Sequence, residues 1–147
     1  MRQGVPEFSG IKLSQDIGAC TAFDVNKVEV VRMSGSILVE TAGVIGAGSV
    51  NGGGNSGFQA LNIAVQFGAK RIVLVGFDMR LDRGVHWHGR HPSGLNNPGD
   101  PLFVHWRRAL NSAASTLADL GVEVINASPI STLTAYPVMS LKEAISC

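Results

Sequence analysis

The chain has 147 residues, of which 45% are hydrophobic and 16% charged, and its formal net charge is +1. This length and balance fit one globular domain with a single core and exclude a disordered chain. The nearly neutral charge, without a basic run, argues against nucleic acid as a partner. No apolar stretch reaches the roughly 20 residues of a membrane-spanning helix, and the start lacks a signal-peptide layout. We therefore expect no membrane partner and a cytoplasmic location.

The first 49 residues carry the weaker secondary-structure pattern. Residues 28–33 (VEVVRM) and 36–41 (SILVET) flank a Ser-Gly pair, and this arrangement predicts a β-hairpin with imperfect apolar alternation. Residues 42–57 are rich in glycine, which is typical of a connection that must approach something closely. We expect residues 1–49 to form a less regular, β-rich part of one domain that spans the whole chain.

Residues 50–147 carry the stronger pattern. Its predicted elements are a helix over 56–67, a buried strand over 72–75, a helix over 102–120, a strand over 122–126 and a short helix over 141–145. Helices that alternate with apolar strands indicate parallel strands joined by right-handed crossovers. The predicted fold class is therefore α/β: a mostly parallel sheet flanked by helices, with the hairpin region before a βαβ core; the resemblance described below makes this expectation Rossmann-like.

A glycine-rich turn, GGGNSG, precedes the first of these helices. Gly54 and Gly57 let the backbone approach a ligand, and Asn55 or Ser56 can cap the helix. The helix start attracts phosphate through its free N–H groups and its dipole. The turn also fits G-x-G-x-x-G, the pattern of dinucleotide-binding folds, and Asp78 lies 21 residues after Gly57, near the distance expected of the acid that binds ribose. Such a fold needs a strand directly before the glycines, and the sequence GVIGAGSVN is a poor strand. An ordinary turn with a capped helix is the alternative.

Polar side chains follow both predicted strands. Asp78 comes just after the first strand, and Asn126 and Ser128 come at the end of the second. In open α/β sheets, ligands bind beyond the carboxyl ends of the strands, and helix N-termini fall at the same edge. We therefore expect these three side chains to converge with Asn55 and Ser56 on a ligand. For Asp78, a cap of a turn or helix is the alternative.

The long connection over 79–101 begins at that edge, and its length is typical of a functional loop. The connection contains three histidines with the spacing H-x-H-x-x-H, which are His86, His88 and His91. It has no cysteine and few carboxylates, and this composition argues against a metal site. Proton transfer by His91 or His88 is the preferred role, and Trp87 offers a stacking face for a base or sugar. A structural loop with hydrogen-bonded histidines is the alternative. We predict no metal and no cofactor.

The segments GGNSG, GFDMR, HWHGRHP and GVEVINASP resemble a family of uncharacterised phage and prophage proteins over roughly residues 50–147. That family is similar in layout to sialyltransferase-like and DUF115-type Rossmann-like proteins. The resemblance implies a nucleotide or nucleotide-sugar pocket. The residues that it implies there are Asn55, Ser56, Gly57, Asp78, His86, His88 and His91. Members of the family begin with a strand and a Gly-Pro-Ser turn that residues 1–49 do not match, so we expect a shortened chain or a pocket completed by a partner subunit.

Three functions are compatible with these residues. The first is a phage-type protein with a glycosyltransferase-like fold that binds a nucleotide or nucleotide sugar, in which His91 or His88 deprotonates an acceptor hydroxyl. The second is a non-catalytic, oligomeric protein that sequesters a signalling nucleotide. The third, supported by the glycine spacing alone, is an NAD-type dinucleotide-binding fragment. All use the same sheet edge, and the sequence leaves open whether a reaction is catalysed. We expect a homo-oligomer, because the mean hydropathy of +0.20 and the short sheet indicate a buried apolar edge.

Overall fold

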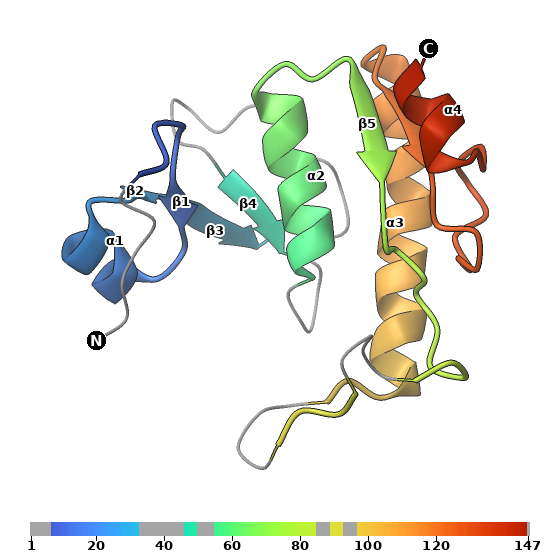
Figure 1. Ribbon diagram of the computed structural model, residues 1–147, viewed down its shortest axis with the longest axis horizontal. Coiled ribbons are helices and arrows are strands. Elements are labelled where there is room, and N and C mark those ends of the chain that lie inside the picture. The colour runs from blue at the N-terminus through green and yellow to red at the C-terminus, as the bar shows by residue number, and fades with distance from the viewer. Residues whose placement is uncertain (1–6, 33–45, 50–54, 85–88, 93–96, 147) are drawn as a thin grey trace.

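The computed structural model describes residues 7–32, 46–49, 55–84, 89–92 and 97–146. In chain order the elements are β1 (Leu13–Ser14), α1 (Ile17–Phe23), β2 (Asn26–Lys27), β3 (Glu29–Arg32), β4 (Gly46–Ser49), α2 (Ser56–Gln66), β5 (Arg71–Leu74), α3 (Asp100–Asp119), β6 (Glu123–Asn126) and α4 (Leu141–Ser146). Figure 1 shows β1, α1 and β2 on one side of α2, and β5, α3 and α4 on the other. Among the described residues, no helix has the length and apolar character needed to cross a membrane.

All strand pairs between these elements are parallel, so the predicted α/β class with parallel strands is confirmed. The described strands form three two-stranded sheets, β1–β2, β3–β4 and β5–β6. In the last of these, Leu74 lies opposite Asn126. A single isolated bridge adds Val138 in parallel beside Asn126, so β6 has neighbours on both edges at its carboxyl end.

The predicted hairpin in the first half stays a prediction, because its turn and its second arm, 36–41, lie outside the described residues. The pairing observed for β3 is parallel, with β4, and places Glu29 opposite Gly46 and Arg32 opposite Ser49. The sequence Gly-Ala-Gly-Ser of β4 has low intrinsic β propensity. Strand preference is set mainly by packing, and β4 lies against α2. Its pairing is therefore a tertiary effect that residue propensities do not reveal.

In the second half, the observed elements agree with the predicted ones to within two residues at each end. α2 begins where the Asn55 side chain accepts a hydrogen bond from the Phe58 N–H at 2.8 Å. It ends before Gly68, whose φ of +81° is a conformation that favours glycine. α3 begins with Asp100 and Pro101, and a proline is well tolerated in the first turn because that turn's N–H groups lack intrahelical acceptors.

The main core lies between the helices α2 and α3 and the strands β5 and β6. Its buried side chains are Phe58, Leu61, Val65, Leu74, Ala109, Leu110, Ala113, Leu117, Val122, Val124, Leu133 and Tyr136. By contrast, α1 buries none of its side chains. The first part of the chain contacts α2 through a hydrogen bond from Gln15 Nε2 to Gln59 Oε1 at 2.8 Å.

Candidate edge site at the ends of β5 and β6

β5 points toward the side of the molecule on which α2 and α3 begin, as Figure 1 shows. β6 is parallel to β5 and therefore ends at the same edge. The start of α2 contacts the residues that follow β5, because a Cβ built on Gly57 would lie 2.7 Å from the Phe77 ring. The helix start and the strand end are thus in direct contact, and we call this region the edge site.

The N-terminus of α2 presents backbone donors to the edge site. Asn55, buried at 8% exposure, accepts the Phe58 N–H with its side chain and the Gln59 N–H with its backbone oxygen at 3.0 Å. The N–H groups of Ser56 and Gly57 belong to the first turn and have no intrahelical acceptor. Ser56 is exposed, so an anion can approach this positive end of the helix dipole. Gly54, also predicted to bind ligand, lies outside the described residues.

Hydrogen bonds tie the loop after β5 to the loop after β6. Ser128 Oγ accepts from the Phe77 N–H at 2.8 Å, and Ser131 Oγ donates to the Phe77 carbonyl at 2.6 Å. The Thr132 N–H donates to the Asp78 carbonyl at 3.0 Å. These bonds fix the backbone of the loop that carries Asp78. The predicted ligand residue Ser128, at 2% exposure, therefore has a scaffolding contact.

Asn126 is fully buried at the end of β6, and one of the two polar atoms of its side chain makes no hydrogen bond among the described residues. Its Oδ1 accepts from the Ser128 N–H at 3.0 Å. Its Nδ2 is buried and has no hydrogen-bond partner among the described residues. A buried donor without an acceptor costs about 1–3 kcal/mol. Among the described residues, His105 Nε2 and Trp106 Nε1 of α3 are also buried without a partner, but Asn126 is the one that follows a strand at this edge.

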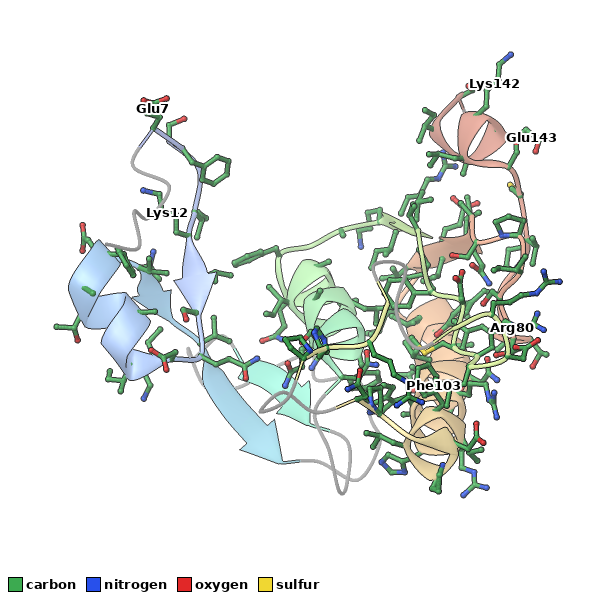
Figure 2. All side chains as sticks on the ribbon, turned by 60° about the horizontal axis from the view of Figure 1, so that its bottom comes forward. Glu7, Lys12, Arg80, Phe103, Lys142 and Glu143 are labelled. Carbon is green, nitrogen blue, oxygen red and sulfur yellow. The ribbon has the colours of Figure 1, made fainter. Side chains whose placement is uncertain are left out.

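Charged groups follow Asp78 on the exposed side of the loop. Arg80 is hydrogen-bonded to Asp82 and donates from Nη1 to the Ile130 carbonyl at 3.1 Å. Its hydrogen bond to Asp82 raises the pKa of Arg80, with a smaller contribution from the Asp78 charge, and the same hydrogen bond lowers the pKa of Asp82. Figure 2 shows Arg80 at the outer side of the C-terminal half, away from α2. Within the described chain, the half-buried Asp78 carboxylate accepts no hydrogen bond, so it remains available to a ligand hydroxyl.

The histidine-rich connection is described only in part. His91 is half-buried; its N–H donates to Asn97 Oδ1 at 2.9 Å, and Asn97 Nδ2 donates back to the His91 carbonyl at 3.4 Å. The loop is therefore closed on itself at this point by an asparagine. His86, Trp87 and His88 lie outside the described residues.

Sequence reasoning missed three side chains that shape the edge site. Phe77 packs on Gly57, Thr132 holds the loop after β5, and Arg107 of α3 donates from Nη1 to the Met79 carbonyl at 3.0 Å. Thr132 follows β6 at a greater distance than Ser128 does. A search for polar residues after strand ends would find Thr132 if it included residues further along the chain. Phe77 and Arg107 give no comparable signal, because an apolar residue after a strand and an arginine on a helix are both ordinary.

Comparison with known proteins gives no assignment: no family model, curated protein or solved structure matches the chain. The function is therefore inferred from the chemistry of the edge site alone. Its elements are a helix N-terminus whose first N–H groups have no intrahelical acceptor, a carboxylate beyond a strand, and a buried amide donor.

Proposed function

We propose that the chain binds a phosphate-bearing nucleotide or nucleotide sugar at the edge site, in a Rossmann-like arrangement. The observation that carries this proposal is that β4, α2 and β5 follow one another in the chain, with the start of α2 in contact with Phe77 and with a glycine-rich sequence before α2. A glycine-rich turn between a strand and a helix offers backbone N–H groups to phosphate at the positive end of the helix dipole. Because Phe77 directly precedes Asp78, a ligand phosphate and the Asp78 carboxylate would occupy neighbouring parts of one site.

Each residue at the edge has a specific role in this proposal. Gly54, Asn55, Ser56 and Gly57 surround the phosphate, and Asp78 accepts a hydrogen bond from a ribose hydroxyl. Ser128 holds the loop that carries Asp78. The residues assigned to the outer side of the ligand are His86, Trp87, His88 and His91.

The position of β4 favours a dinucleotide as a second candidate. A dinucleotide fold requires a strand directly before its glycines, and β4 ends at Ser49, shortly before Gly52. The Asp78 carboxylate, beyond β5, corresponds in position to the acid that binds ribose in such folds. If NAD is the ligand, it raises the thermal midpoint of the full chain more than NMN or AMP does; equal effects would count against the second candidate.

Substitution of Ser56 by aspartate tests the phosphate site. A carboxylate at the first position of α2 stabilises the helix dipole by about 0.3–1 kcal/mol, so the protein should fold normally. The same charge repels phosphate, and we expect Ser56→Asp to weaken binding of a nucleotide or of pyrophosphate at least about tenfold by calorimetry. Ser115→Asp makes the identical change at an exposed position of α3, and it should leave affinity unchanged. Equal affinities in both variants would refute phosphate binding at α2.

Whether the site catalyses a reaction is tested with the same protein. If it is an enzyme, incubation with a CMP-sugar or a UDP-sugar yields free nucleotide, and His91→Ala abolishes the product, because this residue is our candidate base. If the protein sequesters nucleotides, the ligand is recovered unchanged after binding. Native mass spectrometry of the same samples reports the number of copies in the proposed homo-oligomer and the ligand bound per chain.

A further inference from the structure

Asn126 stands out among the residues of β6 because its buried environment favours an aliphatic side chain. Its neighbours Val124 and Ile125 are buried at 6% and 1% exposure, and Asn126 itself is at 0%. Leu74, opposite it on β5, is also buried. A buried amide in such surroundings lowers the stability of the folded protein unless both of its polar atoms form hydrogen bonds. The Nδ2 atom has no partner within the described chain, so it can still donate one hydrogen bond to a bound molecule.

The orientation of the carboxamide is fixed by its hydrogen bond. The Ser128 N–H can only donate, so the atom 3.0 Å from it is the oxygen and the remaining atom is the donor nitrogen. The backbone of Asn126 is already engaged, since its N–H donates to the Pro137 carbonyl at 2.8 Å and its carbonyl accepts from the Met139 N–H at 3.2 Å. Nδ2 is therefore the one group of this residue left without a partner among the described residues.

Asn126 also lies close to the start of α2 through a short series of contacts. The carboxamide bends toward Ser128, whose hydroxyl accepts the Phe77 N–H at 2.8 Å. The Phe77 ring in turn lies against Gly57. These contacts connect Asn126 to the edge site from the side of β6, whereas the phosphate position is on the side of α2.

We propose that Asn126 Nδ2 donates to a carbonyl oxygen or ring nitrogen of a nucleobase, so that the edge site selects a base-bearing nucleotide over phosphate or pyrophosphate alone. This inference rests on the proposed function. A base has apolar faces and one polar edge, which suits a single donor among aliphatic side chains, whereas a sugar placed there would leave several hydroxyls unpaired. Because Asn126 is fully buried, binding requires a local opening of the structure around the end of β6.

The decisive variant is Asn126→Asp. Aspartate has the same size and keeps an oxygen for the Ser128 N–H, and once ionised it presents an acceptor in place of the Nδ2 donor. Burial raises the pKa of a carboxyl group, so the titrations are made at alkaline pH. The probes are UMP, CMP, AMP, GMP, ribose 5-phosphate and pyrophosphate, titrated calorimetrically into the full chain. We expect at least one nucleotide to bind about tenfold tighter than ribose 5-phosphate and pyrophosphate. We also expect Asn126→Asp to remove that advantage while leaving pyrophosphate affinity within about twofold.

The remaining outcomes overturn the inference in distinguishable ways. If ribose 5-phosphate binds the unmodified protein as tightly as every nucleotide does, no base is recognised, whether or not the variant folds. If Asn126→Asp weakens all probes equally, the amide has a structural role only, and phosphate binding at α2 stands. If the unmodified protein binds none of the probes, the proposed function fails and the base contact fails with it.

Discussion

Buried polar side chains decide how the loops of this protein are held. Asn55 caps α2, Ser128 binds the loop after β5, and the Tyr136 hydroxyl donates to the Leu110 carbonyl of α3 at 2.5 Å. Asn55 and Ser128 each satisfy a backbone N–H that would otherwise lack a partner, and Tyr136 adds a second donor to a carbonyl inside α3. The sequence pattern predicted a cap at Asn55 or Ser56 from their position before a helix, and the structure has it at Asn55. It could not predict the Tyr136 contact, because that contact joins residues of different elements.

Tyr136 should make stability fall at alkaline pH. Burial raises its pKa to about 12, from 10.0 for the free side chain. The stabilisation from the neutral phenol is complete below pH 10 and is lost as pH rises toward 12, because the unfolded chain ionises first. The loss should approach about 2–3 kcal/mol, and Tyr136→Phe should abolish this part of the pH dependence.

The measurement is direct because Tyr136 is the chain's single tyrosine. Its tyrosinate absorbance should titrate near pH 12 in the folded protein and near pH 10 in denaturant. Urea unfolding of the native chain and of Tyr136→Phe across this range gives the corresponding free energies. A midpoint near 10 in the folded protein would contradict the expectation.

At the scale of elements, α2 is the connection between the sheets. It packs against β4, contributes to the main core, and touches the loop after β5. Its extent was predictable from its cap, its apolar face and the glycine that follows it. Its neighbours were not predictable in full, since β4 has a sequence that propensity assigns to a loop. A strand of small residues becomes a strand only when another strand and a helix supply its contacts.

Gly57→Ala should measure the contact between α2 and the loop after β5. Alanine normally stabilises a helix by about 1 kcal/mol relative to glycine. Here its Cβ would lie 2.7 Å from the Phe77 ring, and overpacking costs about 1–3 kcal/mol, so we expect a net loss of stability. In a Phe77→Leu background the ring is absent, and Gly57→Ala should become neutral or stabilising. The coupling energy is obtained from urea unfolding of the four proteins.

Gly18 in α1 provides a matched control for the double-mutant cycle of Gly57→Ala and Phe77→Leu. Gly18 also occupies the second helical position behind a side-chain cap, but the only contact of its added Cβ is with Asp16 Oδ1 at 3.1 Å. Gly18→Ala should therefore leave global stability unchanged or slightly higher. A loss at Gly18 as large as that at Gly57 would show that the cost arises from the helix start and not from Phe77.

At the scale of the whole molecule, the buried apolar residues are unevenly distributed. The main core draws its members from α2, β5, α3, β6 and the residues that follow β6. Among residues 7–28, Val28 is the one buried hydrophobic side chain, whereas Phe8, Ile11 and Ile17 are more than half exposed. Local opening requires less free energy where fewer apolar contacts are lost. The first part of the chain should therefore open independently of the core.

Hydrogen exchange should separate these two parts. Amides of β5, β6 and the middle of α3 should be the slowest to exchange, because Leu74, Ile125 and Leu110 are almost completely buried there. Amides of α1 should exchange much faster, at rates that change little when the core is destabilised by Leu110→Ala, a substitution that costs about 2–5 kcal/mol. Equal protection of α1 and α3 would show that the whole chain unfolds as one unit.

The sequence by itself determined the second half of the protein: two amphipathic helices, two apolar strands, their parallel order and the polar residues at the strand ends. These features follow from local periodicity, capping and turn chemistry, which depend on residues close together in the chain. Tertiary structure alone decided that β3 pairs with β4, that Gly57 meets Phe77 and that Asn126 is buried with an unused donor. Each of these contacts joins groups from distant segments of the chain. The sequence of one strand or helix does not identify the element that will pack against it.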